Sequence, residues 1–273
     1  MDTMDKKLFK KIIANPKFIS GIYNYCDRWC ERCPLTSRCA NYALCEEEFA
    51  NPEARDINNE AFCQKLTEVF RLTLDMLKET AEREGIDLNS LDVETAAKEE
   101  KLKEKTARNH ECSRAAKTYV KMVDNWFISA KGLFEEKEDE LKLKVHLEIP
   151  DANAPAEAAS IKDAIEIIRW YQHQIYTKLM RAIHGELDER PEILDGFPKD
   201  SDGSAKVALI AIDRSIAAWG NMRKHFPKRG DDIIDLLVHL DRLRRKIEKV
   251  FPAARAFVRP GFDEINSSKS NYT

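Results

Sequence analysis

Proline is absent from residue 53 to residue 149, and this gap is the strongest constraint that the sequence places on the fold. A proline inside a helix removes a backbone hydrogen bond and clashes with the preceding turn, so long helices need proline-free sequence. Glycine is also scarce, because its 9 residues are only half of the share of roughly 7% that is usual in proteins. These features predict an all-α protein, a helical bundle of four to five main helices with a small N-terminal Cys-rich cap.

The spacing of apolar residues predicts where the helices lie. In a helix that is buried on one side, apolar residues recur at positions i, i+3, i+4 and i+7. The stripe of the first helix consists of Phe62, Leu66, Val69, Phe70, Thr73 and Leu77. We expect helices over residues 59–83, 92–140, 160–183, 204–225 and 231–251. Gly85 ends the first of them, because glycine readily adopts the left-handed backbone of a helix end.

Residues 141–149 follow a different rhythm, since apolar and polar side chains alternate in Leu-Lys-Leu-Lys-Val-His-Leu-Glu-Ile. Alternation is the period of a strand. No second alternating run lies nearby, and an unpaired strand is not stable alone. We therefore expect an extended segment packed on the bundle, or a strand that awaits a partner, followed by a linker at 150–158.

The chain accordingly divides into five parts. They are a Cys-rich metal-binding cap at 1–57, a long helical pair at 58–140, an extended segment and linker at 141–158, a helical bundle at 159–258 and a flexible tail at 259–273. The cap is too short to hold a core alone. We expect it to pack on the helices, and the segment 159–258 to complete the same domain.

Charge and hydropathy exclude several classes of protein. The net charge of −3 and the pI near 6.1 do not indicate a general nucleic-acid or anionic-membrane binder. No apolar run approaches the roughly 20 residues of a membrane span, and the first residues lack the apolar core of a signal peptide. We expect a cytoplasmic protein, for which an unknown protein partner remains open.

Five of the seven cysteines lie between residues 26 and 45. In the cytoplasm thiols stay reduced, so clustered cysteines bind metal more often than they form disulfides. Four of them have the spacing C-x3-C-x2-C-x5-C, and four converging thiolates suit zinc or the irons of an iron–sulfur cluster. The predicted ligands are Cys26, Cys30, Cys33 and Cys39, with Cys45 as an alternative to Cys39.

An apolar stripe or a set of redox thiols is the alternative to a metal site. On a helix, Cys26, Cys30 and Cys33 would share one face, and cysteine packs as a small hydrophobic residue. Pro34 would interrupt a helix that continued to Cys39. The clustering of most cysteines in one short run favours the metal site.

The choice between zinc and an iron–sulfur cluster depends on spacing. Many structural zinc sites use two ligand pairs that are a dozen or more residues apart. This run is more compact and is closer to the ligand runs of ferredoxin-like clusters. A bundle of this size should not need zinc in order to fold. The sequence therefore favours an iron–sulfur cluster (4Fe-4S), with zinc left open.

Basic and aromatic residues accompany the thiols. A four-thiolate site that holds zinc or an oxidised four-iron cluster carries about two net negative charges. Arg28, Arg32 and Arg38 lie among the ligands and would offset this charge. Tyr23 and Trp29 would contribute to an apolar shell, which tunes solvent access.

The triplet Cys26-x3-Cys30-x2-Cys33 resembles the cluster motif of radical-SAM enzymes, in which three thiolates leave one iron open for the cofactor. The resemblance covers residues 26–33 only. It implies a β/α barrel with the motif after the first strand, and glycine-rich and strand-borne contacts to the cofactor. This chain offers no series of such strands and only 9 glycines, so we do not expect the scaffold of that family.

A second kind of site would lie inside the bundle. Glu166, His173, Asp213 and His239 fall on expected helices and could form a carboxylate–imidazole site. Such groups are more often solvent-facing, or buried and paired across helices. The Glu-x-x-His motif of di-iron bundles is missing, as are a nucleophile elbow and a phosphate-binding glycine loop.

The sequence thus predicts a metal-binding helical protein with a redox, sensing or partner-binding role. One alternative is a zinc-stabilised protein-interaction module, and another is a helical-bundle metalloenzyme with the interior carboxylate/His site. Whether the chain is an enzyme stays open at this point.

Overall fold

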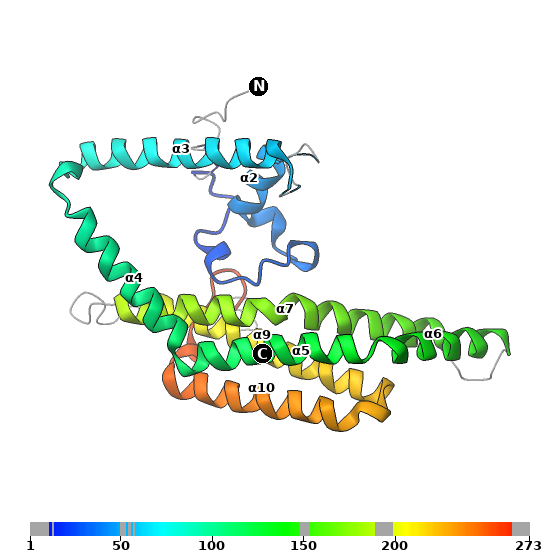
Figure 1. Cartoon of the computed structure of the whole chain (residues 1–273). Helices are drawn as coiled ribbons and strands as arrows, with labels where there is room; N and C mark the ends of the chain where they lie inside the picture. Colours follow the sequence, from blue (N-terminus) through cyan, green and yellow to red (C-terminus); the bar gives the residue numbers. More distant parts are fainter. Residues whose placement is uncertain are drawn as a thin grey trace, which may run out of the picture. The chain divides into compact units, whose positions relative to one another are not determined.

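The computed structural model describes residues 11–12, 14–49, 53, 56, 58–147, 153–188 and 199–263 (Figure 1). The regular elements in these ranges are α-helices and short 3-10 helices, and none of these residues belongs to a strand. The predicted all-α class is therefore confirmed. None of the helices in this part of the chain has the length and apolar character that crossing a membrane requires.

The chain forms two compact units, which we describe separately. The cysteine unit combines Met1–Glu99 with Val258–Thr273, and the helical unit comprises Glu100–Phe257. The division differs from the expected order along the chain, because both ends of the sequence contribute to the cysteine unit.

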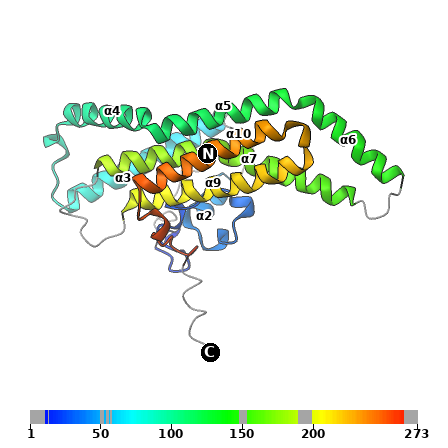
Figure 2. The ribbon, with the colours of Figure 1, turned by 90° about the horizontal axis from the view of Figure 1, so that it is seen from below.

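Four long helices build the helical unit. They are α5 (Glu111–Ser129), α7 (Ala154–Asp188), α9 (Asp200–His225) and α10 (Gly230–Val250). The helix α7 packs on α9, α9 on α10, α10 on α5 and α5 on α7, so the four helices enclose one core. Figure 2 shows them lying lengthwise beside one another.

Apolar side chains at helical spacing fill this core. The buried face of α10 consists of Ile233, Leu236, Leu240, Leu243 and Ile247. Aromatic residues of α5, α9 and the neighbouring helix contact one another in the same unit. The rings of Trp126 and Trp219 have centroids 5.0 Å apart, and Trp219 Nε1 donates a hydrogen bond of 3.0 Å to the hydroxyl of Tyr119. This bond satisfies two polar atoms that burial would otherwise leave without partners.

The single helix expected over 92–140 is wrong, because this stretch forms α4 (Val93–Asn109), α5 and the first part of α6 (Lys131–His146). His110 adopts an extended backbone between the first two, and its Nδ1 accepts a hydrogen bond from the Cys112 amide at 3.2 Å. Histidine is not among the usual capping residues, so this break could not be predicted from the local sequence. The second break lies at Ala130, whose ψ of 2° departs from helical geometry.

The extended segment expected at 141–149 is also corrected, since residues 141–146 are the last turns of α6. Ion pairs at i, i+4 spacing support the helix, with Lys142 Nζ at 2.7 Å from Glu138 Oε1 and Lys144 Nζ at 2.6 Å from Glu140 Oε1. Leu143 and Val145 of this stretch stay exposed. Residues 148–149 lie outside the described part of the chain.

The linker expected at 150–158 needs a similar correction. The helix α7 already begins at Ala154, while residues 150–152 lie outside the described ranges. Its first turn carries Glu157, which faces two lysines of α6. Lys137 Nζ lies 2.5 Å from Glu157 Oε1, and Lys144 Nζ lies 3.0 Å from Glu157 Oε2. His225 Nδ1 of α9 is 3.4 Å from Oε1.

The cysteine unit contains two longer helices, α2 (Ala40–Glu48) and α3 (Glu60–Arg83). The bounds of α3 match the prediction, because the Asn59 side chain caps its start and Gly85, with a φ of 71°, follows its end. Its predicted stripe is not uniformly buried. Phe70 and Leu77 are 60% and 59% exposed.

The predicted flexible tail at 259–263 is instead a turn in which Arg259 pairs with Asp263 at 2.9 Å. Residues 264–273 lie outside the described part of the chain.

Leu240→Ala should lower the free energy of unfolding by about 2–5 kcal/mol, because it leaves a cavity in a closely packed core. Val238→Ala on the same helix is the control, since Val238 is 41% exposed and Leu240 is fully buried. We expect a change within about 0.5 kcal/mol for the control. Urea denaturation followed by circular dichroism measures both, and equal losses would contradict the arrangement of α10.

Glu157→Gln should make the helical unit less stable at neutral pH by about 1–2 kcal/mol. The hydrogen bond from Lys137, reinforced by Lys144, lowers the pKa of Glu157 from 4.5 to about 2. A lowered pKa means that the carboxylate stabilises the fold above pH 4.5, and that this contribution is lost as the pH falls towards 2. Unfolding measured from pH 7 to pH 2 should therefore show a shallower decline for the variant. Glu138→Gln is the comparison variant and should change the pH profile less, because its carboxylate pairs with Lys142 at a position that is 67% exposed.

Candidate metal centre

The cysteine loop, residues 21–39, folds without an α-helix. It consists of three 3-10 turns joined by irregular chain: η1 (Ile22–Asn24), η2 (Cys30–Arg32) and η3 (Thr36–Arg38). Arg28 has a φ of 60°, an uncommon value for a residue other than glycine, and it turns the chain between the first two cysteines. Because the loop is not helical, the cysteines cannot form the apolar stripe of one helix.

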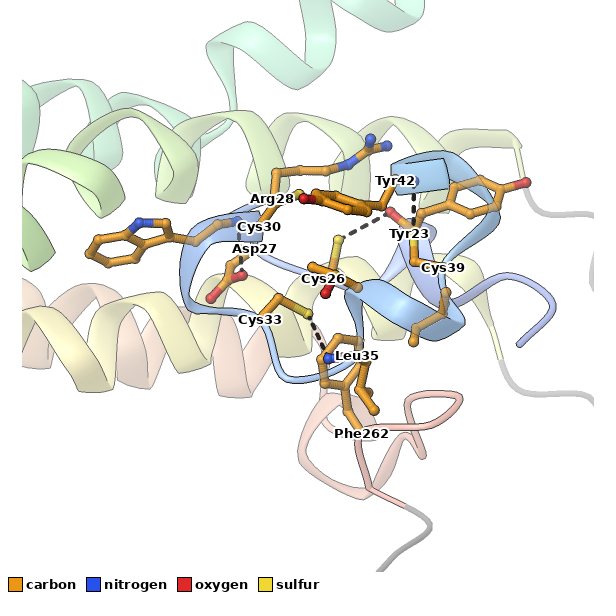
Figure 3. A pocket seen from close by; sticks show the side chains of 13 residues that line it. Tyr23, Cys26, Asp27, Arg28, Cys30, Cys33, Leu35, Cys39, Tyr42 and Phe262 are labelled. Carbon is orange, nitrogen blue, oxygen red and sulfur yellow. Dashed lines mark hydrogen bonds between the residues drawn. The ribbon is translucent and has the colours of Figure 1, made fainter. Parts of the chain in front are cut away.

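The four predicted ligands line one hollow. Figure 3 shows Cys26, Cys30, Cys33 and Cys39 around this space, which has a volume of about 320 Å³ including the part open to solvent. All seven cysteines are free, and these four are partly buried. Apolar and aromatic side chains provide much of the remaining wall: Ile22, Tyr23, Trp29, Leu35, Tyr42 and Phe262. Four reduced thiols thus share a partly apolar environment.

Backbone amides point at two of the sulfur atoms. The Leu35 amide donates to Cys33 Sγ and the Tyr42 amide donates to Cys39 Sγ, each at 3.4 Å (Figure 3). Cys39 also occupies the cap position at the start of α2, where the helix dipole favours a thiolate. Amide–sulfur hydrogen bonds are one of the means by which proteins tune bound clusters. Cys26 Sγ donates to the Tyr23 carbonyl oxygen at 3.5 Å instead.

The thiols interact electrostatically. Burial raises the pKa of Cys30 to about 11, and negative charge on Cys26, Glu31, Cys33 and Cys39 adds to this effect. Burial also raises the pKa of Cys33, although the Leu35 amide acts in the opposite direction. Several thiolates therefore cannot share the hollow without a compensating cation. A bound metal ion supplies that charge, since a coordinating thiol is deprotonated outright.

The sulfur atoms are spread more widely than a single zinc ion requires. With Zn–S bonds of roughly 2.3 Å, the sulfurs of a tetrahedral zinc site lie about 3.8 Å apart. Among the described residues, no three cysteine sulfurs lie within 4.8 Å of one another. In a four-iron cluster each thiolate binds a different iron, so the sulfurs stand farther apart.

Cys45 does not line the hollow. It is exposed on α2, where the Asn41 side-chain amide lies 3.8 Å from its sulfur. Of the two alternatives for the fourth ligand, the geometry favours Cys39 over Cys45. Cys63 is exposed on α3, and Cys112 is buried in the helical unit.

Of the three arginines in the loop, Arg28 lines the hollow. Arg32 places its guanidinium 4.1 Å from the centroid of the Trp29 ring, a cation–π contact at the surface. Arg38 is exposed, and its backbone carbonyl accepts a hydrogen bond of 3.0 Å from the Ile19 amide.

The interior site suggested by four polar residues does not assemble among the described residues. Asp213 pairs with Arg255 at 2.6 Å, and His239 Nε2 lies 2.8 Å from a backbone carbonyl of α5. His173 is exposed, and the Glu166 side chain is 42% exposed. Each of these groups has a separate environment, so they do not form one carboxylate–imidazole centre.

A different group of potential ligands comes together in the helical unit. His184 Nε2 lies 2.9 Å from Glu100 Oε1, and His184 Nδ1 lies 3.5 Å from Asp188 Oδ2. The carboxylates thus face opposite ring nitrogens, and one imidazole presents only one nitrogen to an ion. Lys103 moreover pairs with Asp188. We interpret the group as an ion-pair network. The i, i+4 spacing of His184 and Asp188 was the only signal of it in the sequence.

A third group has the order of a catalytic triad. Ser160 Oγ lies 3.4 Å from His225 Nε2, and His225 Nδ1 lies 3.4 Å from Glu157 Oε1. Asn221 Nδ2, however, donates to Ser160 Oγ at 2.7 Å. Ser160 lies within regular helix, where the backbone amides are engaged and cannot form an oxyanion hole. The group joins the ends of helices and is not arranged for acyl transfer.

Comparison with known proteins adds no relative, because no family model, no curated protein and no solved structure matches the chain. The described residues contain no strand, so the likeness to radical-SAM enzymes does not extend beyond the three-cysteine motif. What can be said of function therefore depends on the cysteine loop itself.

Cys39→Ser should lose most of its bound metal, whereas Cys45→Ser should retain it, because only the first of these side chains lines the hollow. The measurement is metal content per chain after anaerobic purification. Both residues lie in the same short segment, so each variant serves as the control for the other. Equal loss in both, or loss in Cys45→Ser alone, would contradict the assignment of the fourth ligand.

Proposed function

We propose that the chain binds one iron–sulfur cluster (4Fe-4S) through Cys26, Cys30, Cys33 and Cys39, and that it acts in electron transfer or redox sensing. One observation carries the proposal: four free thiols from one short loop line a single, partly apolar hollow. Cysteine thiolates are the usual ligands of such clusters.

The separation of the cysteine sulfur atoms favours a cluster over a single zinc ion. A closed zinc site would hold its sulfurs about 3.8 Å apart. Among the described residues, no three cysteine sulfurs lie even within 4.8 Å of one another. Amides directed at Cys33 and Cys39 add the hydrogen bonds that bound clusters receive from protein. A zinc-stabilised interaction module remains the second candidate, because Cys30-x2-Cys33 has the spacing of a zinc knuckle.

Four protein ligands also bear on the role of the site. A cluster in which every iron has a thiolate leaves no position for a substrate, so electron exchange or sensing fits better than substrate activation. The hollow is partly open to solvent, which suits electron exchange with a partner at the surface. Stable thiolate ligation requires reduced cysteines, and we therefore place the protein in the cytoplasm.

The cluster would support the cysteine unit as well. Among the described apolar residues of this unit, only Ile22 and Ala81 are buried. Domains with so small a core commonly depend on metal or disulfides for stability. Bound metal would therefore add to the stability of this unit.

Anaerobically purified protein should contain about four iron and about four acid-labile sulfide per chain and absorb broadly in the visible region, as a four-iron cluster does. Cys30→Ser should lose this absorption and most of the iron, since it removes one ligand. Cys63→Ser is the matched control, because Cys63 is exposed on α3 of the same unit.

The alternatives give different results in the same experiment. Colourless protein with about one zinc per chain would support the zinc-stabilised module instead. Protein free of both metals after anaerobic purification and after reconstitution with iron and sulfide would overturn both proposals. Full metal content in Cys30→Ser would show that the ligands are wrongly assigned.

A further inference from the structure

A turn from the far end of the sequence reaches the hollow of the cysteine loop. Phe262 lines the hollow together with the four thiols and belongs to the same compact unit (Figure 3). The turn runs over residues 259–263, where the amides of Phe262 and Asp263 both donate to the Arg259 carbonyl oxygen at 3.2 Å. An aromatic side chain from outside the loop thus completes its wall.

Gly261 lets this turn approach the loop closely. Its φ of 74° lies in the left-handed region that favours glycine, and a Cβ atom at this position would lie 2.6 Å from Ile19 Cδ1 and 3.3 Å from Ile22 Cδ1. Ile22 itself is only 2% exposed. The turn therefore packs against the chain that leads into the cysteine loop, and a side chain at position 261 would require Ile19 to shift.

Arg259 holds the turn in shape. Its Nη2 donates to Asp263 Oδ1 and its backbone amide donates to Asp263 Oδ2, both at 2.9 Å. The side chains of the pair are only 15% and 22% exposed, and such charge-assisted contacts are stronger than neutral ones. The guanidinium also lies 4.9 Å from the centroid of the Phe262 ring. The ring that lines the hollow is thus fixed by its own turn.

We infer that the turn over residues 259–263 is a cap on the cysteine site, and that Phe262 is a positioning residue that limits the access of water and small reagents to the four thiols. For bound iron this inference rests on the proposed function, whereas for the free thiols it does not. Apolar side chains around a metal site control solvent access and so the exchange of its ligands. The thiols meet this cap on one side of the hollow, and removing the ring opens that side.

The first test uses the full-length protein with its metal removed and its thiols reduced. Iodoacetamide alkylates accessible thiolates, and peptide mass spectrometry gives a rate for each cysteine. In Phe262→Ala the four thiols of the hollow should react roughly threefold or more faster than in the unaltered protein. Cys45 and Cys63 are exposed outside the hollow, and their rates should not change.

The second test uses protein loaded with iron and sulfide under anaerobic conditions. Phe262→Ala should bind the same amount of iron but release it to a strong iron chelator roughly threefold or more faster. Phe262→Leu should restore most of the slow release, since it refills the wall with an apolar side chain. Val258→Ala is the matched control, because Val258 is 58% exposed and does not line the hollow.

A second variant distinguishes the loss of the cap from a folding defect in Phe262→Ala. Gly261→Ala keeps the ring but strains the turn, because a φ of 74° is unfavourable for a residue with a Cβ atom, and it should accelerate both reactions in the same way. Unchanged rates in both variants would overturn the cap while leaving the cluster proposal intact. Faster alkylation in a chain that binds no iron would uphold the cap and refute the cluster.

Discussion

The cysteine unit has almost no core of its own, and this is the constraint on which the rest of its structure depends. Among its described apolar residues only Ile22 and Ala81 are buried, so hydrophobic burial alone provides little stabilisation. The loop that carries the thiols consists of short 3-10 turns, which have weaker hydrogen-bond geometry than α-helices. Its conformation is held by contacts of other kinds, namely amide–sulfur hydrogen bonds and the turn that packs against it, and the proposed metal would add thiolate bonds to these.

The helical unit is stabilised in the opposite way. Its four helices bury continuous apolar faces, and its charged residues are satisfied in pairs such as Asp213 with Arg255. Asp213 and His239, which the sequence placed in a possible interior site, are engaged in separate contacts of this kind. Under the proposed function, loss of metal from the cysteine loop would not require the four helices to unfold, because different parts of a protein can open separately.

The sequence predicted those features that depend on neighbouring residues. The proline gap gave the all-α class, Asn59 and Gly85 gave the bounds of α3, and the spacing of the cysteines gave four side chains that line one hollow. It failed where a residue takes an unusual role, as at His110, and where alternation concealed a charged helix in residues 141–146. Phe262 could not be predicted either, because local pattern does not reveal contacts between the ends of a chain.

The cysteine unit consists of two segments that are far apart in the sequence, and this limits how the protein can be divided into fragments. Because Met1–Glu99 and Val258–Thr273 belong together, the helical unit is an insertion within a discontinuous domain. A fragment cut after Glu99 would keep the four thiols of the hollow and yet lack Phe262, which forms part of the wall around them.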